Sequence, residues 1–210
     1  MDVWDTLTVF LELVLIVIGL IFSLKIKNKL IGAYFLFMFF AVVVATIFAY
    51  FKMNNMFAFH LETLVVLVIF NTLLYTEAKL ISKRVLLYSC TAFILLEVFS
   101  LLTYNKIDAF NVINRSTSSI WFIVISIYFY YKLLISENLI NFKSNPMFWY
   151  VTGLFIYFIS NLLLFFTFNY VMFIDEQTSA IIWNINNISK LVFYTFLIQG
   201  MSVEEGNLVK

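Results

Sequence analysis

Five ionisable residues lie within long apolar stretches of the chain, where charge is costly. Three are carboxylic acids, one is a lysine and one is a histidine, namely Glu12, Glu62, Glu97, Lys190 and His60. A charged side chain at the centre of a membrane helix costs about 2.5–3.5 kcal/mol on insertion scales, and such groups nearly always face the bundle interior. One lysine cannot neutralise three carboxylates, so the other acids must be protonated, hydrated or bound to something. The set therefore predicts a polar cavity.

Lys190 belongs to a polar face of the last apolar segment. Residues spaced i, i+4, i+7 and i+11 share one side of a helix, and here they are Trp183, Asn187, Lys190 and Tyr194. We expect Lys190 to point into the bundle, with Glu97 or Glu12 as its counter-ion. The remaining polar candidates are three asparagines: Asn161, Asn184 and Asn186. Asparagines also join membrane helices by hydrogen bonds without any ligand, which is the alternative interpretation of this face.

The elements that must position these residues are membrane helices. Of the 210 residues, 63% are apolar and 12% are charged, whereas soluble domains contain about 25% charged residues. A helix of roughly 20 apolar residues crosses a bilayer. The sequence thus predicts an all-α bundle of seven transmembrane helices in one domain, residues 1–210. The predicted spans are 6–24, 30–51, 57–76, 85–104, 117–135, 147–170 and 178–200.

The distribution of basic residues sets the expected orientation, because cytoplasmic loops carry an excess of Lys and Arg. Lys52, Lys106 and Arg115 mark one side, which we expect to be outside together with the N-terminus. With this orientation, the polar residues of the spans fall mostly in the outer half of the membrane. We expect a multi-pass protein of the inner membrane. The opposite side, with the C-terminus, is expected to be cytoplasmic and carries Lys25, Lys27, Lys29, Lys79, Lys83, Arg84, Lys132, Lys143 and Lys210.

Several function classes lack support in the sequence. A net charge of +1 argues against direct nucleic-acid binding, which uses concentrated basic surface. The chain has one cysteine and one histidine and no phosphate-binding loop or metal-ligand spacing, so we expect no cofactor and no metal. A lysine in a seventh helix is also typical of retinal-binding proteins, but position 186 is Asn rather than Asp. An intramembrane hydrolase would have to use His60, Glu62 and Glu97 with Ser100 or a water.

A set of aromatic, asparagine and other residues is spread over nearly the whole chain, namely His60, Glu137, Asn138, Leu139, Pro146, Phe148, Trp149, Gly153, Tyr157, Phe158, Asn161, Trp183, Asn184, Asn187 and Ile188. In these residues the chain resembles a family of small bacterial seven-helix membrane proteins of about this length, most of them uncharacterised. Members often carry His at the position of Asn186 and a Glu about one turn deeper than Glu62. In size and topology the chain is also similar to the membrane accessory proteins of type VI-B CRISPR systems. That resemblance implies a role in antiphage defence.

Three functional hypotheses follow. The first is a non-enzymatic, receptor-like or accessory protein whose outer cavity senses a small molecule or lipid. Its tail after residue 200 is too short to be a signalling domain, so it would act through a protein partner on the cytoplasmic side. The second is a membrane effector that forms a pore as a homo-oligomer, which needs a polar stripe through the full depth of a helix. The third is the intramembrane hydrolase.

Overall fold

The computed structural model describes residues 3–51, 53–54, 56–103, 112–135, 139–171 and 176–208. Within these ranges the chain is all-α, with seven α-helices and one short 3-10 helix, η1. The prediction of seven helices is confirmed. Their bounds are α1 (Val3–Ser23), α2 (Lys29–Tyr50), α3 (Met56–Thr76), α4 (Lys83–Thr103), α5 (Val112–Ile135), η1 (Leu139–Ser144), α6 (Pro146–Val171) and α7 (Glu176–Leu208).

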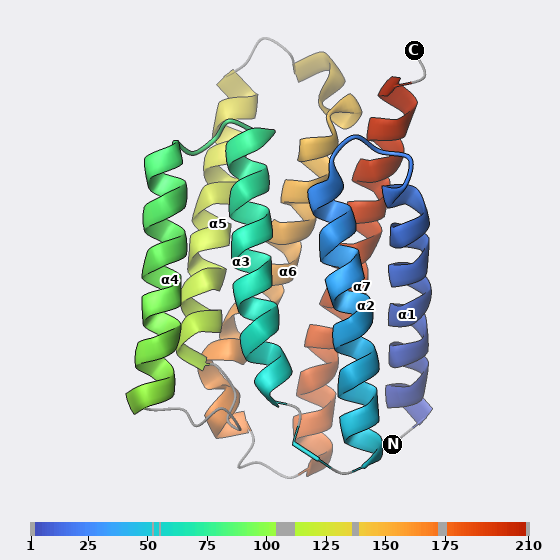
Figure 1. Cartoon of the computed structure of the whole chain (residues 1–210), viewed down its shortest axis with the longest axis vertical. Coiled ribbons are helices and arrows are strands. Elements are labelled where there is room, and N and C mark those ends of the chain that lie inside the picture. Colours follow the sequence, from blue (N-terminus) through green and yellow to red (C-terminus); the bar gives the residue numbers. More distant parts are fainter. Residues whose placement is uncertain are drawn as a thin grey trace.

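Consecutive helices pack side by side, and α7 returns to contact α1, so the helices form a closed ring (Figure 1). Helices α3 and α5 also touch across the ring. The helices alternate in direction, so that α1 begins at one end of the bundle and α7 ends at the other (Figure 1). This order brings α1, α2, α3 and α7 around one part of the interior, where the site described below lies.

Six of the described helices, α1 to α6, are long and apolar enough to cross a membrane. Their outward side chains are apolar, as at Leu95, Phe99 and Leu163. This architecture is consistent with a multi-pass membrane protein. Helix α7 is long enough but more polar than the others, because asparagines and Lys190 occupy the middle of the helix. That α7 also crosses the bilayer, and that the N-terminus lies outside, stay predictions.

Two helices extend beyond the spans predicted from hydropathy. Helix α5 begins at Val112 rather than at residue 117, and it therefore includes Arg115. The polar sequence around Arg115 suggested a loop, but these side chains are buried between helices. Helix α7 continues to Leu208 rather than ending at 200. The start of α6 at Pro146 agrees with the prediction, as expected where proline's missing N–H costs least.

Aromatic side chains fill the centre of the bundle. Tyr34, Phe70 and Phe193 are almost completely buried, and their ring centroids lie 5.3–5.9 Å apart. Glycines let α6 and α7 approach closely, since a Cβ at Gly153 would lie 2.9 Å from Cβ of Phe196. Small residues at helix contacts serve the same purpose in other membrane bundles. The packed core thus holds the polar residues of α7 at fixed positions.

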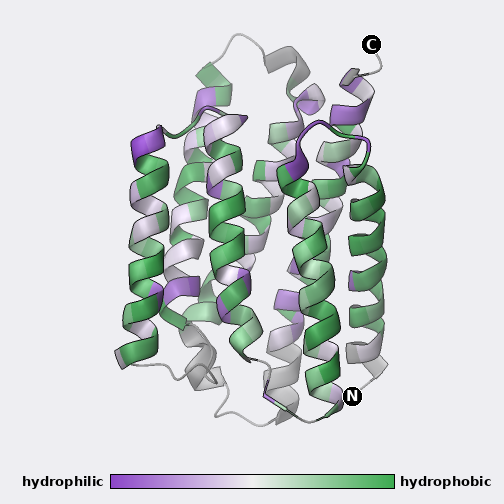
Figure 2. Ribbon diagram, in the orientation of Figure 1, coloured by the Kyte–Doolittle hydropathy of each residue, from purple (hydrophilic) through white to green (hydrophobic). Residues whose placement is uncertain are grey.

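Polar residues occupy two regions of the bundle (Figure 2). One is the end at which α7 terminates, where the α1–α2 and α3–α4 connections carry basic residues. The other lies within the helices, in the half nearer the start of α1. The buried polar residues of these helices include His60, Glu62, Glu97 and Arg115.

Candidate ligand-binding site

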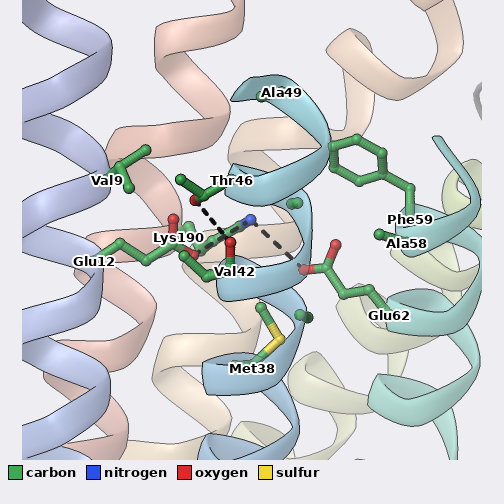
Figure 3. Close-up of a pocket in the computed structure, with 12 residues that line it drawn as sticks. Val9, Glu12, Met38, Val42, Thr46, Ala49, Ala58, Phe59, Glu62 and Lys190 are labelled. Carbon is green, nitrogen blue, oxygen red and sulfur yellow. Dashed lines mark hydrogen bonds and ion pairs between the residues drawn. The ribbon is translucent and has the colours of Figure 1, made fainter. Parts of the chain in front are cut away.

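Lys190 lies inside the bundle between two carboxylates. Its Nζ atom is 3.6 Å from Oε1 of Glu12 on α1 and 3.7 Å from Oε1 of Glu62 on α3 (Figure 3). The side chain of Lys190 is 12% exposed, so the inward orientation is confirmed. Tyr194, one turn further along α7, donates a hydrogen bond of 3.0 Å to Oε1 of Glu12. Lys190 therefore has two counter-ions in the structure. Glu12 was predicted from the sequence, and Glu62 was not.

Arg115 provides a second buried cation. Its guanidinium donates to Oε2 of Glu62, and both side chains are less than one-tenth exposed. The rings of Phe59 and Phe165 lie 4.9 Å and 5.3 Å from the guanidinium carbon, which suits cation–π contact. Placing Arg115 in an outer loop was therefore wrong. Glu62 joins α3 to both α5 and α7 through one carboxylate.

The buried charges nearly balance, contrary to the expectation of one lysine facing three acids. The cluster contains two basic side chains, Lys190 and Arg115, and two carboxylates, Glu12 and Glu62, so positive and negative groups are equal in number. We call these four residues, with Tyr194, the lysine cluster. Burying an ion pair is tolerated when both partners remain and is strongly destabilising when one is removed. The cluster is therefore held together electrostatically and needs no bound ion to neutralise it.

Glu97 belongs to a second group. Its Oε1 lies 2.5 Å from Nδ1 of His60, and its Oε2 accepts a hydrogen bond from the side chain of Asn114. The prediction that Glu97 pairs with Lys190 is not supported, because α4 lies across the ring from α7. His60 is 5% exposed, so its side chain is buried inside the bundle. We call His60, Glu97 and Asn114 the histidine cluster.

The predicted asparagines differ in their burial and in their contacts. Asn161 donates a 2.7 Å hydrogen bond to Oγ of Ser189 and thereby joins α6 to α7. Asn186 is buried and accepts from the hydroxyl of Tyr157 at 3.4 Å. Asn184 and Asn187 are half-buried and belong to neither cluster. The half-buried Trp183 meets the ring of Phe59 edge-on, with ring centroids 5.8 Å apart.

A cavity of about 200 Å³ lies above the lysine cluster. It extends along α2 from Met38 to Ala49 and is closed laterally by Val9 of α1 and Phe59 of α3. Figure 3 shows Lys190 between Glu12 and Glu62 among the residues that line it, and we call these three residues the floor of the cavity. The α2 wall includes Ala41, Ala45 and Ala49, whose small side chains leave this space open. The described lining residues are Val9, Glu12, Met38, Ala41, Val42, Ala45, Thr46, Ala49, Ala58, Phe59, Glu62 and Lys190.

Sequence reasoning missed three features of this site. One is Arg115, whose signal was its position among small polar residues that all face the interior: Asn114, Ser116, Ser118 and Ser119. Another is the Glu62–Lys190 contact, because the sequence does not say which helices are neighbours. The third is the wall of α2, where alanines recur every four residues at 41, 45 and 49. That spacing places small side chains on one face and was visible in the sequence.

Comparison with known proteins identifies no relative. No protein-family model matches the chain, and neither does any curated protein or solved structure. The resemblance to small bacterial seven-helix proteins thus stays a prediction based on individual residues. The features of this chain that bear on function are therefore the cavity and the two clusters.

Proposed function

We propose that this chain is a receptor-like membrane protein that binds a small molecule or a lipid in the cavity above the lysine cluster and acts through a partner. One observation carries the proposal, namely that mostly apolar side chains line a space whose floor is made by Lys190, Glu12 and Glu62. Ligand sites typically combine mostly apolar walls with a few polar groups that fix orientation. The volume is below the roughly 300–1,000 Å³ of pockets for drug-sized molecules, so the ligand is small or inserts one chain.

Helix α7 provides a route from this site to the opposite end of the bundle. Lys190 and Glu204 lie on the same helix, fourteen residues apart, or about 21 Å at 1.5 Å per residue. Glu204 accepts hydrogen bonds from the backbone N–H of Asn28 at 2.9 Å and from the hydroxyl of Tyr150 at 3.2 Å. A shift of α7 on ligand binding would change these contacts. A partner at that end, which we expect to be cytoplasmic, would sense the change.

The pore hypothesis has less support than the receptor hypothesis. Towards its C-terminal end, the inward side of α7 carries Phe193, Tyr194, Leu197 and Met201, all of them buried. A conducting path within one chain would have to pass these packed side chains. The hydrolase hypothesis gains the close pairing of His60 with Glu97. Neither residue is among the described residues that line the cavity, so the cavity gives a substrate no access to the pair.

Native mass spectrometry of the intact protein, released from mild detergent, tests the proposal. The wild type should carry a reproducible extra mass, and Lys190→Met should lose it while still folding. Lys132→Met is the matched control, because Lys132 lies exposed near the end of α5, and it should retain the mass. An unoccupied wild type that stays unoccupied when membrane lipids are added would contradict the proposal. Equal occupancy of Lys190→Met and the wild type would do the same.

A further inference from the structure

The ammonium group of Lys190 has hydrogen-bonding capacity that its two carboxylates do not use. The distances of 3.6 Å and 3.7 Å to Glu12 and Glu62 exceed the 2.7–3.2 Å that is usual for such hydrogen bonds. Each pair is therefore an electrostatic contact without a direct hydrogen bond. An acceptor oxygen of a bound molecule can approach the ammonium from the cavity. The floor thus offers a donor to whatever occupies the space.

Glu12 offers an acceptor beside that donor. The hydrogen bond from Tyr194 goes to Oε1 of Glu12, the same oxygen that faces Lys190. The second carboxylate oxygen can accept a hydrogen from a molecule in the cavity. A hydroxyl group fits both positions at once, because it accepts through its oxygen and donates through its hydrogen. A group that only donates or only accepts would satisfy one of them.

The charge balance disfavours an ionic ligand. Lys190 and Arg115 already balance Glu12 and Glu62, so a carboxylate, phosphate or ammonium would add an uncompensated charge to a buried site. Burying an unpaired charge is far more costly than burying a hydrogen-bonded neutral group. An anion would also lie beside two carboxylates, and a cation would lie beside Lys190. A neutral polar group avoids both repulsions.

We infer that the cavity binds an uncharged amphiphile with a hydroxyl head group, which hydrogen-bonds to Lys190 and Glu12. Its apolar part lies along the α2 wall from Ala41 to Ala49, between Val9 and Phe59. This inference rests on the proposed function and specifies the chemistry of its ligand. Ala41, Val42, Ala45 and Ala49 contribute no polar group to this wall, and the hydroxyl of Thr46 already donates to the carbonyl oxygen of Val42, so selectivity comes from the floor.

Three photoactivatable probes test the inference. They share one eight-carbon chain with a diazirine and differ only in the head group, which is a hydroxyl, a carboxylate or an ammonium. The protein is labelled in phosphatidylcholine nanodiscs, and modified peptides are quantified by mass spectrometry. Labelling of Ala41–Ala49 is divided by labelling at Leu95 and Phe99, which are exposed on α4. This ratio corrects for the different partitioning of the probes into the bilayer.

The hydroxyl probe should label the α2 wall about tenfold more than either charged probe, as expected for hydrogen bonds to charged groups. Lys190→Met should reduce its ratio to that of the charged probes, and Lys132→Met should not. Ala45→Trp, which fills the cavity and leaves the lysine cluster intact, should also abolish the labelling. It serves as the second variant in case Lys190→Met does not fold.

Two outcomes would overturn the inference and are distinguishable from failure of the proposed function. Labelling of the wall by a charged probe as strongly as by the hydroxyl probe would contradict the ligand chemistry while leaving a ligand site in place. A wall-to-α4 ratio near one for all three probes would contradict the inference as well. In that case, an extra mass in the native spectrum that disappears in Lys190→Met would still support a ligand of another kind.

Discussion

Glu62 is the residue at which the buried polar contacts of three helices meet. One carboxylate oxygen faces Lys190 on α7, and the other accepts from Arg115 on α5. Because Glu62 is buried, neither cation can be replaced by water without reorganising the bundle. At the scale of single residues, the stability of this region therefore depends on each member of the lysine cluster. Three of its members, Glu12, Glu62 and Lys190, also form the floor of the cavity, so stability and ligand binding are linked.

Removal of Arg115 should test the balance of charges. Arg115→Met leaves Glu62 with Lys190 as its only described cation partner, and breaking a buried ion pair typically costs about 3–5 kcal/mol. We expect a correspondingly lower free energy of unfolding in detergent. Lys132→Met on the same helix is exposed and should stay within about 0.5 kcal/mol of the wild type. Equal stability of the two variants would show that Arg115 contributes no more than a surface residue.

At this scale the sequence predicted which residues are buried better than which residues pair. The inward position of Lys190 follows from the cost of exposing a charge to lipid. This cost can be recognised without knowing which helices are neighbours. The partners of Lys190 depend on which helices are neighbours, and this is why Glu62 was not predicted as a counter-ion and Glu97 was named beside Glu12. Arg115 was missed because a positive residue near a helix end is normally a loop residue.

At the scale of elements, α7 connects the regions of the molecule. Its first half carries the asparagines and Lys190, and its C-terminal extension contacts the α1–α2 connection through Glu204. Close packing against α6 holds it in register. Gly200 allows this approach, because a Cβ there would clash with the ring of Tyr150 and lie 3.1 Å from the carbonyl oxygen of Pro146.

Two glycines of α7 should respond differently to alanine. Gly200→Ala forces the buried Tyr150 ring to move, and overpacking of this kind typically costs about 1–3 kcal/mol. Nothing lies within 4 Å of a Cβ at Gly206, so Gly206→Ala should be neutral or stabilise the helix by up to about 1 kcal/mol. Thermal unfolding of both variants in one detergent measures the difference. A Gly200→Ala variant as stable as Gly206→Ala would argue against tight α6–α7 contact.

Helix α7 also shows which features can be predicted from the sequence and which cannot. Its polar face was recognisable from the helical spacing, but its last turns were not, because an apolar span was assumed to end at the membrane surface. The end at residue 200 was set by the fall in hydropathy, whereas the helix continues because Met201 is buried and Glu204 is hydrogen-bonded. Contacts with other elements thus extended the helix beyond its apolar part.

At the scale of the whole molecule, the two ends of the bundle differ in charge. The connections at the end where α7 terminates carry lysines, and Arg115, once counted at the other end, is inside the bundle. The predicted orientation rests on the excess of basic residues in these connections. With the N-terminus outside, the cavity would lie in the outer half and the contacts of Glu204 would lie at the cytoplasmic surface.

Single-cysteine labelling should test this orientation. In a Cys90→Ser background, Asn54→Cys and Lys27→Cys place one thiol at each end of the bundle, and both positions are exposed. With the N-terminus outside, a membrane-impermeant maleimide applied to intact spheroplasts should modify Asn54→Cys. Lys27→Cys should react only after the membrane is permeabilised. The reverse pattern would place the cavity in the cytoplasmic half and contradict an outward-facing site.

The measurement that tests the central claim most directly is the bound mass of Ala45→Trp in native mass spectrometry. The indole ring would occupy the cavity beside α2 without changing any charge of the lysine cluster. Leu95→Trp places the same side chain on the lipid-exposed face of α4. We predict that Ala45→Trp loses the extra mass while Leu95→Trp retains it, with both proteins folded. Retention of the full mass by a folded Ala45→Trp variant would show that the cavity is not the ligand site.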